Sequence, residues 1–231
     1  MNKLCLICMR GRSKGLKNKH LKKINNKHLL SFTINQAVNT KMFDAIVVST
    51  DSKKIALACK EYNINLILKR PKYLSTDYVG KVRVIKHAVK EAEKLLNKKF
   101  DIVFDLDATS PLRYVSDIKA SYKQFLKHNS SNLISGSIAK KNPYFNQVEI
   151  RNNKVKIVKK PRKTILRRQD SPKVYDLNAS IYIWTKKSLY SQKSLFNKNT
   201  TLYIMPDKRS IDIDSILDFK LVETLMKDRK V

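Results

Sequence analysis

The sequence predicts an α/β fold of three layers, a Rossmann-like arrangement in which a mostly parallel sheet lies between helices. Short apolar runs alternate with segments of helical periodicity from the N-terminus up to His128. Polar and charged residues follow several of these runs directly, at the strand ends where parallel sheets bind ligands. A length of 231 residues and a hydrophobic content of 42% suit one domain that covers residues 1–231.

The first half of the chain is expected to contain four strands and four helices in alternation. The strands are the short apolar runs, at 4–8, 45–49, 64–68 and 100–106. The helices carry apolar residues at helical spacing, at about 28–40, from the cap at 50–52 to about 61, at 79–96 and at 116–128.

The rhythm changes after residue 132. The expected elements are a strand at 133–138, a hairpin of 145–150 and 154–158, a strand at 181–184 and a closing helix at about 216–228. Asn152 and Asn153 supply the two-residue turn of the hairpin. We interpret residues 140–175 as an excursion from the sheet that serves dimerisation, and a free surface hairpin is the alternative.

The charge and the cysteines limit the function classes. The formal net charge is +30, but the lysines are spread along the chain and no zinc-finger, RNP or basic-zipper pattern occurs. We therefore do not expect nucleic acid as the partner. Cys5 and Cys8 lie three apart in an apolar strand and should point to opposite faces of the sheet. The odd cysteine count, the lack of a signal peptide and the lack of any run of about 18 apolar residues favour a cytoplasmic protein without a membrane partner.

The loop from Met9 to Lys19 is the strongest candidate for a binding site. It follows the first strand and combines Gly11 and Gly15 with several cations, so backbone amides and positive charge can converge on phosphate. Neither the Walker spacing nor the dinucleotide-binding spacing is present. A solvated basic turn is the alternative.

A second candidate site is the pair Asp212 and Asp214. In an extended segment these carboxylates project to the same side, where they repel each other unless a cation lies between them. Oxygen ligands of this kind suit Mg²⁺, which would also carry a triphosphate. The alternative is that Asp214 or Ser215 only caps the last helix.

Six motifs in order carry a resemblance to a known family. They are Arg10-x-x-Ser13-Lys14-Gly15, Ser49-Thr50-Asp51, Arg70-Pro71, Thr109-Ser110-Pro111-Leu112-Arg113, Asn178-Ala179-Ser180-Ile181-Tyr182 and Asp212-Ile213-Asp214. This succession resembles the CMP-sialate synthetase (acylneuraminate cytidylyltransferase) family over nearly the whole chain. The resemblance implies a single nucleotidyltransferase domain, a homodimer in which the excursion crosses to the partner, and the reaction of CTP with an acidic nine-carbon sugar to give the CMP-sugar and pyrophosphate.

Two segments, 105–113 and 167–170, look most similar to the CMP-legionaminate synthetases within this family. The chain also departs from the family pattern. Asp107-Ala108 stands where sialate members have Gln-Pro, Lys19-His20 stands for Lys-Asn, and Gly80 replaces a small hydroxyl residue. The carboxylate at position 107 should alter which sugar substituents are accepted.

The resemblance also implies roles for individual residues. The implied nucleotide-binding residues are Met9, Arg10, Gly11, Ser13, Lys14, Gly15, Lys19 and Arg70. The implied sugar-binding residues are Asp107, Thr109, Ser110, Arg168, Gln169 and Asn178, with Arg168 offering a bidentate cation to the sugar carboxylate. Catalysis would rest on Arg10 and Lys19 at the triphosphate and on Asp212 and Asp214 with Mg²⁺.

Rival functions remain open at this point. Within the enzyme class, the chain could transfer a different nucleotide, or the sugar could be N-acetylneuraminate or another nonulosonate. Outside that class, the chain could be a basic nucleic-acid-binding protein on the same fold without catalysis, or a structural dimer subunit of a larger assembly.

Overall fold

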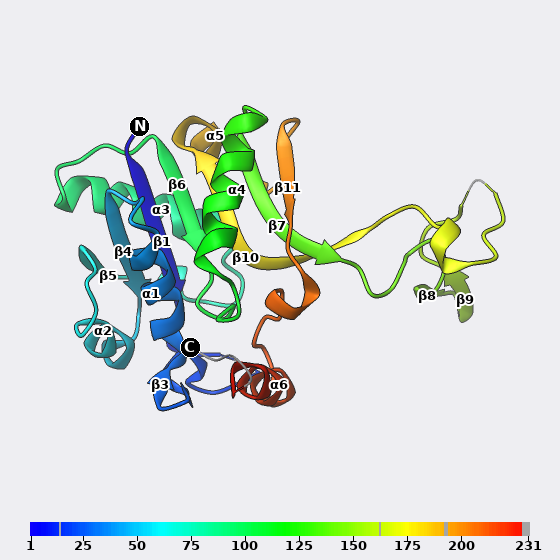
Figure 1. The fold of residues 1–231 in the computed structure, drawn as a ribbon, viewed down its shortest axis with the longest axis horizontal. Coiled ribbons are helices and arrows are strands. Elements are labelled where there is room, and N and C mark those ends of the chain that lie inside the picture. Colours follow the sequence, from blue (N-terminus) through cyan, green and yellow to red (C-terminus); the bar gives the residue numbers. More distant parts are fainter. Residues whose placement is uncertain (14, 162, 192–193, 228–231) are drawn as a thin grey trace.

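The computed structural model describes residues 1–13, 15–161, 163–191 and 194–227, arranged around one central sheet (Figure 1). Within these ranges the sheet has seven strands in the order β11-β7-β10-β6-β1-β4-β5. The strands are β1 (Lys3–Met9), β4 (Ala45–Thr50), β5 (Leu66–Lys69), β6 (Ile102–Leu106), β7 (Asn132–Ile138), β10 (Tyr175–Thr185) and β11 (Thr200–Ile204). The helices are α1 (Leu29–Thr40), α2 (Lys53–Cys59), α3 (Lys81–Leu95), α4 (Val115–Lys127), α5 (Lys186–Ser191) and α6 (Ile216–Lys227).

The sheet is mostly parallel, as predicted. β1 pairs in parallel with β4 and β6, β4 with β5, and β7 with β11, whereas β10 runs antiparallel to both β6 and β7. The chain extends the sheet from β1 through β4 to β5 and then returns to place β6 on the other side of β1. The loops after β1 and β6 therefore diverge at a topological switch point, which is where ligands bind in open α/β sheets.

Helices cover both faces of the sheet and complete the three predicted layers. One core cluster joins Cys5 and Ile7 of β1 to Ile34 of α1 and to residues of α2 and α4. The second cluster joins Leu4 and Leu6 of β1 to residues of α3 and α5. Cys5 belongs to the first cluster and Cys8 packs against the second, which confirms that they point to opposite faces. Both are free thiols, as is Cys59.

The predicted boundaries hold for most elements of the first half, and the larger differences come later. β10 begins at Tyr175, although only residues 181–184 were expected to be a strand. Its first half was missed because the register shifts between Leu177 and Tyr182, where Ala179 has a φ of 52°, so no regular alternation marks it. The short helix α5 and the strand β11 were also missed.

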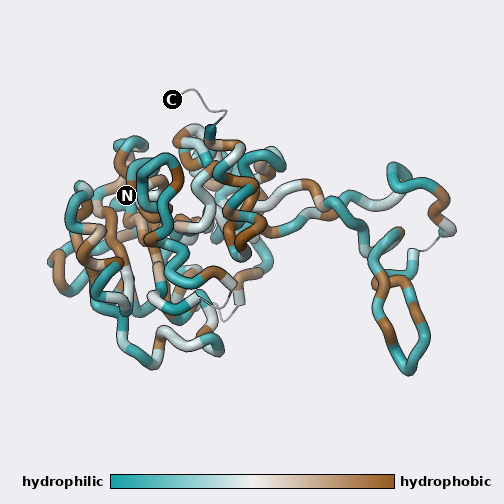
Figure 2. The backbone as a smooth tube through the Cα atoms, turned by 90° about the horizontal axis from the view of Figure 1, so that it is seen from below, coloured by the Kyte–Doolittle hydropathy of each residue, from teal (hydrophilic) through white to brown (hydrophobic). Residues whose placement is uncertain are grey.

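Between β7 and β10 the chain leaves the sheet as an arm, described over residues 139–161 and 163–174, that projects from the body (Figure 1). The arm carries the predicted hairpin, formed by β8 (Val148–Arg151) and β9 (Lys154–Ile157). Asn152 and Asn153 both have positive φ, 50° and 58°, as a two-residue hairpin turn requires. Figure 2 shows hydrophobic positions on both hairpin strands, and Ile150 and Val155 are 75% and 68% exposed.

One further feature positions the loop that follows β1. A third core cluster packs Leu16 of that loop and Ile24 of the small strand β2 (Lys23–Ile24), which pairs with β3 (Lys27–His28), against Ile213 and Phe219. This packing holds the C-terminal segment under the loop.

No helix within the described ranges has the length and apolar character needed to cross a membrane.

Candidate active site

Gly11 brings the loop after β1 close to the loop after β4. A Cβ at position 11 would lie 2.8 Å from the Cβ of Ser52, so only glycine fits without a shift of the backbone. The Gly11 amide donates a hydrogen bond of 2.8 Å to Oδ1 of Asp51. Ser52 caps α2 by accepting from the Ile55 amide, as the sequence predicted.

Gly15 and Lys19 join this loop to the acidic segment near the other end of the chain. A Cβ at Gly15 would lie 2.1 Å from the backbone oxygen of Asp214. Lys19 Nζ donates to the Ile213 oxygen at 3.0 Å and to Asp214 Oδ1 at 2.9 Å. The structure thus brings together two predicted site segments that lie almost two hundred residues apart. Lys14 lies outside the described residues.

A cavity of about 1140 Å³ opens beside the loop, over β4 and β5. Arg10, Arg12 and Arg70 line it, together with residues 50–53, 71–72 and 75–78. Arg70 is 6% exposed and donates through Nη2 to the Ser49 oxygen at 2.7 Å, which fixes its guanidinium at the end of β4. Arg10 forms an ion pair with Asp77. The cavity has the volume and the cationic lining that a nucleotide needs.

The other predicted nucleotide residues are placed less favourably for side-chain contact. The Met9 side chain is buried in the core, so only its backbone can face a nucleotide. Ser13 has a buried hydroxyl that makes no hydrogen bond among the described residues.

Asp107 and Thr109 follow the end of β6, which lies on the other side of β1 from β4 and β5, and they do not line the cavity. We call the edge of the sheet between the loops after β1 and β6 the crevice. Asp107 Oδ1 accepts from the Thr109 amide at 3.1 Å and from its hydroxyl at 2.7 Å. Lys81 donates to Oδ2 of Asp107 at 3.1 Å. Burial acts to raise the pKa of Asp107, but Lys81 and Thr109 outweigh it and lower the pKa below its ordinary value. Asp107 is therefore ionised at neutral pH.

The remaining predicted sugar-binding residues near this edge are largely engaged with the protein itself. Asn178 accepts from Ser135 at 2.6 Å and donates to Ser210 at 3.0 Å, which ties β10 to the segment before Asp212. Ser110 is fully buried, and its hydroxyl has no partner in the described part of the chain. These contacts make both residues part of the frame around the crevice.

Arg168 and Gln169 lie in a single turn, Arg168–Asp170, on the arm. Arg168 donates to the backbone oxygen of Ala139 at 3.0 Å, where the arm leaves β7. Among the contacts of the described residues, none joins Arg168 or Gln169 to Asp107 or Thr109. The structure of one chain therefore does not assemble all the predicted sugar-binding residues at one place.

Asp212 has the electrostatic character of a cation ligand. Its Oδ1 is buried without a hydrogen-bond partner among the described residues. Burial, followed by the nearby charge of Asp107, raises its pKa to about 6. Within the same ranges no cluster of three His, Cys, Asp or Glu side chains could hold a metal. One or two carboxylates suit a divalent cation that completes its shell with water and substrate phosphate.

Two charged groups of the crevice were not predicted as site residues. Lys81 and Asp105 form an ion pair of 2.9 Å beneath Asp107. Only the side chain of Lys81 reaches the surface, and no spacing in the sequence connects it to Asp105. His20, noted above as a departure from the family pattern, is 4% exposed, and burial lowers its pKa to about 4. Its imidazole is therefore neutral beside Lys19, Arg70 and Arg10.

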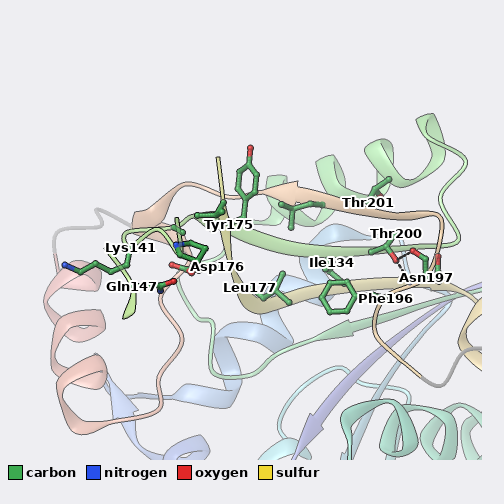
Figure 3. A pocket seen from close by; sticks show the side chains of 14 residues that line it. Ile134, Lys141, Gln147, Tyr175, Asp176, Leu177, Phe196, Asn197, Thr200 and Thr201 are labelled. Carbon is green, nitrogen blue, oxygen red and sulfur yellow. Dashed lines mark hydrogen bonds between the residues drawn. The ribbon is translucent and has the colours of Figure 1, made fainter. Parts of the chain in front are cut away.

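A separate apolar cavity of about 640 Å³ lies at the root of the arm. Ile134, Leu177 and Phe196 line it together with Tyr175 and Lys141 (Figure 3). The sequence did not predict this cavity, because its lining comes from β7, β10 and the segment before β11, two of which were missed or only partly found.

Comparisons with known proteins agree with this arrangement. A family model described as cytidylyltransferase matches residues 4–231. The chain is 45% identical over 223 residues to the CMP-N,N'-diacetyllegionaminic acid synthase of Campylobacter jejuni subsp. jejuni, covering 96% of this chain and 94% of that one. It is 42% identical over 228 residues to the post-translational flagellin modification protein B of Campylobacter coli, covering 99% and 96% of the two chains. The solved structure of a CMP:2-keto-3-deoxy-manno-octonic acid synthetase complexed with CTP has the same fold, with a TM-score of 0.69, 15% identity, and coverage of 98% and 99%.

Proposed function

The chain belongs to the cytidylyltransferase family, and we propose that it activates legionaminic acid or a close relative with CTP, giving the CMP-sugar and pyrophosphate. The observation that carries this proposal is the junction of Gly15 and Lys19 with Asp214. It joins a phosphate-binding loop to a pair of carboxylates at the switch point of the sheet. A basic loop that was only a solvated turn would not need this close packing.

The reaction is a displacement at phosphorus. The anomeric hydroxyl of the sugar attacks the α-phosphorus of CTP in line, the new P–O bond forms, and pyrophosphate leaves. Negative charge grows on the phosphate oxygens, so fixed cations at the end of β1 lower the barrier. Arg10 and Lys19 are proposed for this role, and Arg70 would hold the nucleotide within the cavity of about 1140 Å³.

Asp212 and Asp214 would hold Mg²⁺, since the buried Oδ1 of Asp212 has no other partner among the described residues. When bound, the ion neutralises charge on the triphosphate. Asp214 forms an ion pair of 2.9 Å with Lys19, so it would have to release Lys19 in order to serve as a ligand. Lys19 then becomes available to phosphate oxygens.

Asp107 and Thr109 are proposed to meet the sugar, because they follow β6, on the other side of β1 from β4 and β5, and do not line the nucleotide cavity. An ionised carboxylate accepts hydrogen bonds from hydroxyl or amide groups of a sugar. It also repels the carboxylate of the sugar, so Asp107 would face another part of it.

We further propose that the protein is a homodimer in which the arm crosses to the partner. The hairpin residues Val148, Ile150 and Val155 are 60%, 75% and 68% exposed on an arm that a lone chain leaves largely in solvent. Apolar patches of this kind indicate an interaction surface. An arm that reaches the partner would also bring Arg168 and Gln169 near a second crevice. The three free thiols fit a protein that acts in a reducing cytoplasm.

Pyrophosphate release tests the proposal directly. The purified protein is assayed with Mg²⁺, each nucleoside triphosphate and a panel of acidic sugars that includes legionaminic, pseudaminic and N-acetylneuraminic acids. We expect turnover with CTP and the fastest rate with legionaminic acid or a derivative. Turnover with none of the sugars would remove the enzyme proposal. Sub-micromolar binding to random duplex DNA at ~150 mM salt would then favour the nucleic-acid rival, because nonspecific binding is weaker than this.

A further inference from the structure

Lys81 occupies an unusual position for a lysine. It is the first residue of α3, and Gly80 before it provides no side-chain cap. A positive charge at the N-terminus of a helix is opposed by the helix dipole. Lys81 therefore does not stabilise α3, and its placement needs another explanation.

The contacts of the ammonium group supply that explanation. Lys81 Nζ lies 2.9 Å from Asp105 Oδ2 and 3.1 Å from Asp107 Oδ2, and it sits 4.6 Å from the centre of the Tyr182 ring. The Asp105 side chain is 1% exposed, whereas that of Asp107 is 22% exposed. One carboxylate is thus an internal anchor, and the other faces the crevice.

The buried Asp105 carboxylate explains why the Lys81 side chain keeps this position. A buried carboxylate without a cation is strongly unfavourable, so Asp105 keeps Lys81 at the end of β6. Lys81 in turn holds one oxygen of Asp107, and Thr109 holds the other. Both oxygens of the Asp107 carboxylate are therefore fixed, and the lone pairs that remain free point in a constant direction.

We propose that Lys81 is a positioning residue for the sugar: it holds the Asp107 carboxylate in one orientation, so that this carboxylate accepts hydrogen bonds from donor groups of the acidic sugar. This inference rests on the proposed function. Asp107 is the carboxylate that distinguishes this chain from the sialate members. The inference adds to the proposed function that Asp107 is held in place by the Asp105–Lys81–Asp107 chain of ion pairs. Lys81 itself does not touch the substrate.

The test must separate positioning from stability. Lys81→Met alone leaves Asp105 buried without a cation, so its melting temperature should fall. The double variant Lys81→Met/Asp105→Asn removes the whole internal ion pair, and we expect its melting temperature to return toward that of the wild type. Lys90→Met, at an exposed position of the same helix, is the matched control.

The readout is the Michaelis constant for each substrate, measured by pyrophosphate release with the sugar that the wild-type enzyme uses best. In the folded double variant the KM for the sugar should rise about tenfold or more, since charge-assisted hydrogen bonds to an oriented carboxylate weaken. The KM for CTP should stay within about twofold, because Lys81, Asp105 and Asp107 do not line the nucleotide cavity. A normal KM for the sugar, or a rise confined to CTP, overturns the proposal.

A mutant cycle with Asp107→Asn tests whether Lys81 acts on the sugar through Asp107. This variant retains the Lys81–Asp105 pair and should raise the KM for the sugar by itself. Adding Lys81→Met/Asp105→Asn to it should cause no further rise, because Lys81 acts through Asp107. A further rise of the same factor would show that Lys81 acts independently and would overturn the proposal. Absence of turnover in the wild-type enzyme would instead contradict the proposed function.

Discussion

Replacement of Asp212 by asparagine should stabilise the metal-free protein at neutral pH, although it removes a proposed ligand. The pKa of Asp212 is about 6 in the folded chain, against 3.8 for an ordinary aspartate. Burial is the first cause, and the charges of Asp107 and Asp214 add to it. Folding therefore disfavours the ionised form, and Asn occupies the same volume without the charge.

These two pKa values decide the sign of the stability change and the pH range over which it appears. Below pH 3.8 the side chain is protonated in both the folded and the unfolded chain, so Asp212 has no ionisation cost. The cost appears between pH 3.8 and about 6 and is complete above that range. A difference of about 2 pKa units corresponds to about 3 kcal/mol at 1.36 kcal/mol per unit. We expect Asp212→Asn to gain on the order of 2 kcal/mol at pH 8 and almost nothing at pH 4.

Urea unfolding at both pH values, with EDTA present, measures this difference. Added Mg²⁺ should stabilise the wild type more than the variant, because the ion binds only where the carboxylate is present. Asp218→Asn is the control with the opposite sign. Hydrogen bonds from Ser215 outweigh burial and lower the pKa of Asp218, so its replacement should reduce stability at pH 8. A variant Asp212→Asn that is less stable than the wild type at pH 8 would refute the electrostatic reasoning.

Three further predictions concern the loop and the arm. Arg10→Ala should lower kcat about a hundredfold, in line with ~3 kcal/mol for one preorganised donor, and Arg10→Lys should recover only part of it. Steady-state kinetics with a melting control decide this, and a change within twofold would move the triphosphate site elsewhere. Gly15→Ala should weaken CTP binding and lower the melting temperature, because its Cβ would lie 2.1 Å from the Asp214 oxygen. Calorimetric titration with CTP measures the first effect, and unchanged affinity would contradict the packing argument. Light scattering should give twice the chain mass of 26.8 kDa for the wild type and a lower mass for Ile150→Asp, while equal masses would exclude the hairpin from the interface.

The sequence predicted the fold well where local periodicity and burial coincide. The strand β1 is apolar on both faces because helices pack on both faces of the sheet, and α3 presents one apolar face to the sheet. The hairpin turn was readable because two asparagines accept positive φ at low cost. These features depend on neighbours in the sequence, which is why spacing alone revealed them.

The missed elements depend on distant partners. β11 contains two threonines and a tyrosine and pairs only with β7 at the edge of the sheet, so it lacks the continuous apolar run of a central strand. The first half of β10 is interrupted where Ala179 takes a φ of 52°. Neither feature has a local sequence pattern that distinguishes it from a loop.

The site shows the same division. The motifs of the loop and of the acidic pair were recognisable one by one, and the family relationship they indicated is confirmed. Their contact through Gly15 and Asp214 joins residues almost two hundred positions apart, and no spacing predicts such a contact. The partners of Lys81 were hidden for the same reason, since Asp105 reads from the sequence as one more residue of a buried strand.

The pairing of charges in this crevice bears on how a nucleotide would enter it. The chain has a formal net charge of +30, yet two of the cations at this edge already have carboxylate partners. Arg10 pairs with Asp77, and Lys19 pairs with Asp214. A triphosphate would therefore exchange partners with the protein, and each cation it takes would release a carboxylate. The release of Asp214 beside Asp212 would create the pair of ligands for Mg²⁺ at the moment when the phosphates arrive. Binding of the ion and binding of CTP should for this reason reinforce each other, whereas a site whose cations stood free would bind the anion without the metal.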